Sequence, residues 1–318
     1  MIFYICHNRI PVSRGTFFRF KIEFEIEFRC RDNTGDPEEF GGMRFEHLNL
    51  LTNDGVMVHG WFIKTGKDDS EVARVPTVIY FHGNAGNISN RLPFYHELWE
   101  KLHVNIIAAE YRGFGASEGT PSEAGLKQDA QAFLDFAWGN DSIDRSKIFL
   151  FGRSLGGAVA VDAAVTAERR DVKIRGVILE NTFLSVADIA VVLYPFLGLF
   201  RPILQSPVLK SVWGTKDIIN RLHVPILFIS GEQDQLIPCT HMKQLFVLCR
   251  RVRGTQFCSI PNGTHNDTPV HGGQQYYDFI GRFFIDASEF HDERRDSRGV
   301  SDASIDSIVS EYDDRFFH

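Results

Sequence analysis

One stretch of sequence decides the fold: KIFLFGRSLGGA, residues 147–158. An apolar run typical of a buried strand leads into a serine between glycines, and an alanine-rich segment typical of a helix follows. The pattern G-x-S-x-G in a strand–turn–helix setting predicts a nucleophile elbow, a sharp turn with Ser154 at its apex. Gly152 and Gly156 fit this turn because the strand and helix backbones nearly touch there and leave no room for a β-carbon.

The elbow pattern alone is moderate evidence. With 27 glycines among 318 residues, such a pentapeptide can arise by chance. The strand before it and the helix after it favour the elbow. The remaining support has to come from residues elsewhere in the chain that would act together with Ser154.

The alternation of strand-like and helical patterns along the chain predicts an α/β fold. Two strand-like segments, residues 44–51 and 56–63, are joined by an Asn-Asp-Gly turn, and a helical pattern covers residues 122–138. Fully buried parallel strands read as short continuous apolar runs. Such runs alternate with helical patterns, so a doubly wound, mostly parallel sheet with helices on both faces is predicted. The runs are residues 77–81, 105–109, 148–151, 177–179 and 226–229.

Three regions follow from the composition along the chain. We expect the catalytic domain at residues 43–286. Residues 1–42 are predicted to be an N-terminal extension that ends in a polar linker and holds no span of ~20 apolar residues. Residues 287–318, dense in charged residues and serine, are predicted to be a disordered tail.

Charge and motifs exclude several classes of protein. A net charge of −7 and a pI near 5.9 argue against a nucleic-acid-binding surface. The five cysteines are odd in number and lack C-x-x-C spacing, so they are expected to be reduced, mostly buried thiols. No metal or cofactor motif is present, and no cofactor is expected.

Two segments downstream of Ser154 offer an acid and a base. The loop after residues 226–229 holds Asp234, and IPNGTHND at residues 260–267 places His265 after a strand end and a glycine turn. We predict His265 as general base and Asp234 as the acid that orients it. Glu232 and Glu180 are the reserve acids. The histidines at 223 and 241 are expected on the surface.

The segment YFHGNAGN, residues 80–87, follows a buried strand. A glycine-containing loop there can present a backbone N–H to a developing oxyanion. We predict the N–H groups of Asn84 and Leu155 as the two donors. His82 is expected to brace the loop through its ring nitrogens. An ordinary β-turn is the alternative for this segment.

Six stretches together resemble the α/β-hydrolase superfamily, most closely alpha/beta-hydrolase domain-containing protein 13 and its fungal relatives. The match covers about residues 43–286 and implies an eight-stranded α/β-hydrolase fold. It also implies nucleophile, acid and base roles for Ser154, Asp234 and His265. The stretches are residues 81–87, 111–119, 149–158, 180–185, 228–238 and 263–268.

The resemblance implies a serine hydrolase that cleaves an acyl ester or thioester, carried by a small molecule, a lipid or an acylated protein. Relatives in this family include protein depalmitoylases, and members usually carry a membrane anchor. The resemblance therefore implies peripheral membrane contact for this protein, or a cytoplasmic location if that contact is absent. A serine peptidase and a non-catalytic binding protein of the same fold are the alternatives.

An insertion at about residues 184–213 is strongly apolar between residues 189 and 200. At this length it is too short to cross a bilayer. Its place between two sheet strands predicts a small lid that contacts acyl chains, and a buried helix is the alternative.

Overall fold

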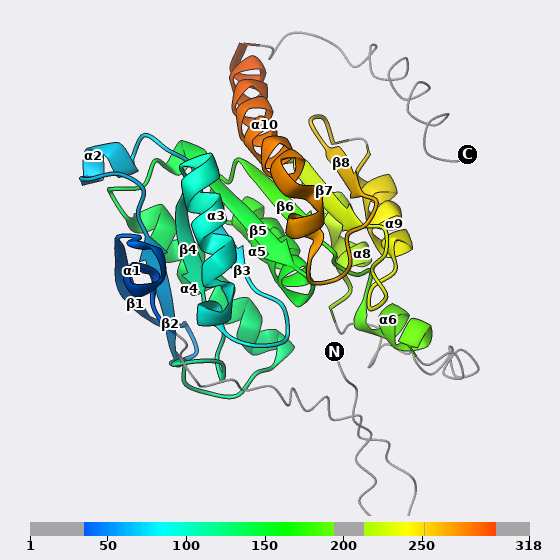
Figure 1. The fold of residues 1–318 in the computed structure, drawn as a ribbon, viewed down its shortest axis with the longest axis horizontal. Helices are drawn as coiled ribbons and strands as arrows, with labels where there is room; N and C mark the ends of the chain where they lie inside the picture. The colour runs from blue at the N-terminus through cyan, green and yellow to red at the C-terminus, as the bar shows by residue number, and fades with distance from the viewer. Residues whose placement is uncertain (1–34, 194–212, 251, 297–318) are drawn as a thin grey trace, which may run out of the picture.

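The computed structural model describes residues 35–193, 213–250 and 252–296, in which eight strands form one sheet (Figure 1). The strand order is β1-β2-β4-β3-β5-β6-β7-β8, and every neighbouring pair from β4 onward is parallel. The first two pairs, β1 with β2 and β2 with β4, are antiparallel. The α/β-hydrolase fold with a mostly parallel eight-stranded sheet is thereby confirmed. The strands are β1 (Phe45–Leu51), β2 (Met57–Ile63), β3 (Thr77–Phe81), β4 (Asn105–Ala109), β5 (Ile148–Arg153), β6 (Gly176–Glu180), β7 (Ile226–Gly231) and β8 (Gln256–Ile260).

Helices cover both faces of this sheet (Figure 1). On one face α3 (Leu92–Leu102) and α10 (Thr268–Asp296) enclose one apolar core, and on the other α4 (Glu123–Gly139), α5 (Leu155–Arg169) and α9 (Cys239–Cys249) enclose a second. Every residue of β3 to β7 is buried as a result. The short helices are α1 (Pro37–Gly41), α2 (Asp69–Val72), α6 (Val186–Leu193) and α8 (Thr215–Ile218), with 3₁₀ turns at Ile88–Arg91, Arg145–Lys147 and Ile219–Arg221.

The predicted linker before residue 43 is a folded helix at its end. Helix α1 begins after Asp36, whose carboxylate accepts the amide of Glu39 at 2.9 Å. The ring of Phe40 lies 6.0 Å from that of His96 on α3, and Met43 is fully buried. Residues 37–41 of the predicted linker are therefore helical and lie against α3. Residues 1–34 lie outside the described part of the chain.

The last described helix continues past residue 286. Helix α10 has a non-helical backbone at Gly273 and runs on to Asp296. Ala287 is buried on the same face as Phe283 and Phe284, because spacings of three and four residues bring side chains to one side of a helix. Residues 287–296 of the predicted tail therefore continue α10 in the structure. Residues 297–318, and residues 194–212 of the predicted lid, lie outside the described ranges.

The position of His241 also differs from the prediction. It lies buried on α9, and its Nδ1 accepts the amide N–H of Leu184 at 3.3 Å. Burial lowers the pKa of His241 below its ordinary 6.5, and Lys216 acts in the same direction. The carboxylates of Asp188 and Asp234 act against this lowering without reversing it. The folded protein therefore favours the neutral form of this imidazole more than the unfolded chain does.

A first prediction concerns the close packing of the elbow. A β-carbon on Gly156 would lie 1.9 Å from the carbonyl oxygen of Phe81, so Gly156→Ala has to displace backbone. We expect a loss of about 3 kcal/mol or more in the free energy of unfolding, measured by denaturant titration. Gly139→Ala is the matched control, because a β-carbon there meets nothing within 4 Å. It should be neutral or stabilising by up to about 1 kcal/mol. Equal stability of the two variants would contradict the packing argument.

A second prediction concerns pH and stability. Because the pKa of His241 is lowered in the folded state, the unfolded chain binds the extra proton first as the pH falls through 6.5. Stability should therefore drop between pH 7 and pH 5, by up to about 1.4 kcal/mol per pH unit from this residue. The variant His241→Asn, whose side-chain oxygen can still accept the Leu184 amide, should show a shallower fall in melting temperature. His59, whose pKa is also lowered by burial, keeps part of the slope.

The control for this experiment is His103→Asn. His103 is exposed and has a φ of 50°, a left-handed conformation that asparagine tolerates. Its replacement should leave the pH slope of the wild type unchanged. A His241→Asn protein with the full wild-type slope would contradict the assignment.

Candidate active site

Ser154 lies between β5 and α5 in a strained conformation. Its φ of 56° and ψ of −120° are rare for a residue with a side chain. The Ser154 amide donates to the carbonyl of Glu180 at 2.9 Å, and the Thr182 hydroxyl donates to the carbonyl of Ser154 at 2.7 Å. These bonds attach the elbow to the end of β6. The serine remains partly exposed, as a nucleophile must be.

The structure brings Ser154, His265 and Asp234 into one line of contacts. The Nε2 of His265 lies 3.1 Å from the Ser154 Oγ, and its Nδ1 lies 2.7 Å from an oxygen of Asp234. The other Asp234 oxygen accepts the amides of Leu236 and Ile237 at 2.9 and 2.8 Å. A carboxylate held by two amides and an imidazole is fixed in orientation.

This arrangement selects one tautomer of the imidazole. Because a carboxylate only accepts, the Nδ1–H of His265 donates to Asp234. The lone pair of Nε2 then faces the hydroxyl of Ser154. The ring is therefore arranged to take a proton from the serine.

The two reserve acids have other partners. Glu232, on the same loop as Asp234, accepts the hydroxyl of Ser259 at 2.6 Å. Glu180 is fully buried, pairs with Arg153 at 3.2 Å and accepts the hydroxyl of Tyr276. Of the three candidate acids, Asp234 is the one in contact with His265.

The loop after β3 lies against the serine. A β-carbon on Gly83 would be 3.5 Å from that of Ser154, and Asn84 follows Gly83 directly. The His82 ring lies under this loop, with Nδ1 2.7 Å from the Gly83 carbonyl and Nε2 3.0 Å from the Glu110 carboxylate. His82 therefore braces the loop, as the sequence predicts. Leu155, the other predicted donor, is the first residue of α5, where amides lack partners within the helix.

Sequence reasoning missed two residues that contact the histidine loop. Arg153 donates from Nη2 to the His265 carbonyl at 2.6 Å, and the Asn181 side-chain amide donates to Thr264 and Thr268 at 3.2 and 2.8 Å. Burial disfavours the charge of Arg153, but Glu180 and two buried tyrosines outweigh it and raise the pKa of the guanidinium above its usual range. The available signal was position: Arg153 precedes the serine, and Asn181 follows a buried strand.

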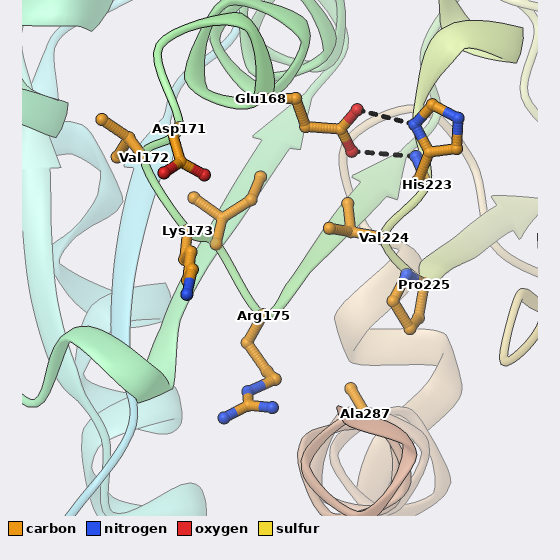
Figure 2. Close-up of a pocket in the computed structure, with 10 residues that line it drawn as sticks. Glu168, Asp171, Val172, Lys173, Arg175, His223, Val224, Pro225 and Ala287 are labelled. Atoms are coloured by element: carbon orange, nitrogen blue, oxygen red, sulfur yellow. Dashed lines mark hydrogen bonds and ion pairs between the residues drawn. The ribbon is translucent and has the colours of Figure 1, made fainter. Parts of the chain in front are cut away.

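A cavity of about 200 Å³ lies at the opposite edge of the sheet (Figure 2). Its lining includes Arg175 and Pro225, which precede β6 and β7, whereas Ser154 follows the carboxyl end of β5. Figure 2 shows Glu168 in contact with His223, whose backbone N–H lies 2.8 Å and whose ring Nδ1 lies 3.0 Å from the carboxylate oxygens. The cavity is therefore separate from the Ser154 site.

Across the described ranges, no group of three or more His, Cys, Asp or Glu side chains is arranged to hold a metal ion. None of the helices in that same part of the chain is long and apolar enough to cross a membrane.

Comparison with known proteins identifies the family. A family model described as serine aminopeptidase, S33 matches residues 74–218. The alpha/beta hydrolase domain-containing protein WAV2 of Arabidopsis thaliana is 42% identical over 241 residues, 73% of this chain and 76% of WAV2. The uncharacterized membrane protein YNL320W of Saccharomyces cerevisiae is 33% identical, over 80% of this chain and 84% of its own.

A solved structure agrees on the fold. An esterase from Pyrococcus furiosus superposes with a TM-score of 0.63 at 18% identity, covering 79% of this chain and 93% of the esterase. Such low identity establishes the fold alone. Together with the extensive match to WAV2, these findings show that the chain belongs to the α/β-hydrolase family.

Proposed function

We propose that this protein is a serine hydrolase that cleaves acyl esters or thioesters through an acyl-enzyme intermediate. The observation that carries the proposal is the line of contacts from the Ser154 Oγ through His265 to Asp234, with distances of 3.1 and 2.7 Å. Membership of a hydrolase family supports it. Strained backbones gather at functional residues, and the φ of 56° at Ser154 also supports it.

In the first half of the proposed reaction, the Ser154 Oγ bonds to the acyl carbon while His265 Nε2 accepts its proton. Asp234 stabilises the imidazolium that forms. The N–H groups of Leu155 and Asn84 donate to the oxyanion of the tetrahedral intermediate. His265 then returns the proton to the leaving alcohol or thiol, and the acyl group remains on Ser154.

In the second half, a water molecule replaces the leaving group. His265 takes a proton from the water as its oxygen attacks the acyl-enzyme carbon. Collapse of this second tetrahedral intermediate releases the carboxylic acid and returns the proton to Ser154. No cofactor takes part in this scheme.

For the substrate, we propose an acyl group carried by a small molecule, a lipid or a protein, with palmitoylated proteins among the candidates. The insertion at residues 184–213 is the proposed lid, and its described helix α6 exposes Val192 while burying Ile189. Contact with a membrane surface is part of the proposal. The name of the yeast relative, a membrane protein, supports it.

A serine peptidase is the second candidate, because the matching family model is described as a serine aminopeptidase. The same catalytic line serves ester, thioester and amide bonds. Purified protein assayed on matched acetyl, octanoyl and palmitoyl esters and thioesters, beside aminoacyl anilides, separates the two. Turnover of anilides alone would replace the esterase proposal with the peptidase.

A third prediction tests the nucleophile. Ser154→Ala should abolish labelling by a fluorophosphonate probe and lower kcat on esters by ~10⁴ to 10⁶. Ser288→Ala is the control, because its hydroxyl only donates to the carbonyl of Phe284 on α10. It should label like the wild type. Full labelling of Ser154→Ala would refute the assignment.

A fourth prediction tests the acid. Asp234→Asn should preserve the loop but favour the wrong tautomer of His265. We therefore expect kcat to fall by a factor on the order of 10⁴. Glu232→Gln is the control, because Glu232 lies two positions away on the same loop and contacts Ser259 instead of His265. Its kcat should stay within about threefold of the wild type. A large loss of kcat in Glu232→Gln, together with a wild-type kcat in Asp234→Asn, would contradict the assignment of Asp234 as the acid.

A further inference from the structure

The residue that precedes the proposed nucleophile reaches across to the loop of the proposed base. Arg153 ends β5, and its Nη2 donates to the backbone carbonyl of His265 at 2.6 Å and to the Asn266 side chain at 3.2 Å. The residue is 9% exposed. Hydrogen bonds from a charged, buried guanidinium are among the strongest that a backbone carbonyl can accept.

The guanidinium of Arg153 is itself fixed by an ion pair with Glu180. Its Nε lies 3.2 Å from one oxygen of Glu180, a carboxylate that is fully buried at the end of β6. The hydroxyl of Tyr276, on α10, donates to the other Glu180 oxygen. Arg153 therefore has little freedom to rotate, because its counter-ion is fixed from a second element.

Asn181 contacts the same carbonyl. Its side-chain amide lies 3.4 Å from the His265 oxygen, and its own oxygen accepts the amide of Gly231 at 2.8 Å. Gly231 ends β7, the strand before the loop of Asp234. The His265 carbonyl is thus approached by donors from the ends of β5 and β6, and one of them, Asn181, also bonds to the strand that leads into the loop of Asp234.

We infer that Arg153 is a positioning residue, which acts through the backbone of His265 to hold the imidazole between Ser154 and Asp234. The inference rests on the proposed function. The loop needs such a clamp because Asn262 and Asn266 beside it are exposed, so polar contacts rather than apolar packing fix its place. An error of 1 Å in the base can cost ~10²-fold in rate.

The test needs variants that remove the clamp without stranding a buried charge. Arg153→Met alone would leave Glu180 unpaired in the core. The double variant Arg153→Met/Glu180→Gln removes both charges and keeps a side-chain oxygen for the Tyr276 hydroxyl. Arg153→Lys keeps the charge but lacks the planar fork that reaches both His265 and Glu180.

The matched control is Arg112→Met/Asp129→Asn. Arg112 is likewise buried and ion-paired at 2.8 Å with a buried acid, Asp129. Its guanidinium also pairs with Asp54, and neither acid belongs to the His265 loop. This control separates the loss of a buried ion pair from the loss of the clamp. Melting temperatures are measured for all variants, and kinetics are recorded well below them.

With p-nitrophenyl butyrate as the probe, we expect the Arg153→Met/Glu180→Gln protein to lose 10²- to 10³-fold in kcat, with KM changed less than threefold. Arg153→Lys should recover part of the loss, and the control pair should stay within about threefold of the wild type. Arg153→Ala keeps Glu180 as a counter-ion for added guanidinium, so guanidinium ion at tens of millimolar should raise its kcat. The same addition should leave the kcat of Arg112→Ala, which likewise keeps Asp129, unchanged.

Two results would overturn the inference. One is a kcat for Arg153→Met/Glu180→Gln equal to that of the control pair. The other is a change in kcat on adding guanidinium that merely tracks the change in melting temperature, in Arg153→Ala and in its control alike. A wild type without hydrolysis or labelling that depends on Ser154 would overturn the proposed function, and the inference with it. An active wild type that tolerates the loss of Arg153 would overturn the inference alone.

Discussion

The close approach of two backbones at the junction of β5 and α5 is the constraint on which the site depends. A β-carbon on Gly152 would lie 2.1 Å from the carbonyl oxygen of Gly156, so glycine is needed for the strand and helix to meet. The turn forces Ser154 to a φ of 56°, a strain of about 1–3 kcal/mol. The packing of β5 and α5, both buried along most of their length, offsets that strain. The serine cannot relax without separating the sheet from its central helix.

The parallel sheet then brings distant segments to this one edge. Ligand sites in open α/β sheets gather at the carboxyl ends of the strands. Here the ends of β3, β5, β7 and β8 lead directly to Asn84, Ser154, Asp234 and His265. The sheet fixes where each loop begins, but it does not fix the last few ångströms. Those depend on hydrogen bonds between loops, such as the two amides on Asp234 and the carbonyl contacts of His265.

The sequence predicts those parts of this arrangement that depend on residues close together in the chain, and it predicts contacts between distant residues less well. Strands β3 and β4 begin and end where their apolar runs do, because both of their faces are buried. The triad candidates could be located because each follows a strand and a turn. The helix after residue 286 was missed because charged residues obscure a single apolar face that contains Ala287. The contact of Arg153 with His265 joins residues 112 positions apart, so the place of Arg153 beside the serine does not reveal which residue it contacts.

The division of labour between apolar and polar contacts explains the form of the site. Hydrophobic burial is strong but non-directional, so it can hold β5 against α5 without aiming an imidazole. Aiming requires directional bonds. A buried pair such as Arg153 with Glu180 contributes little net stability, because its desolvation offsets its attraction. Its value is geometric, since a guanidinium with a fixed counter-ion can present a donor to a single carbonyl oxygen. The charged side chains beneath the site therefore belong to its alignment, and the apolar layers on both faces of the sheet supply the free energy that keeps them buried.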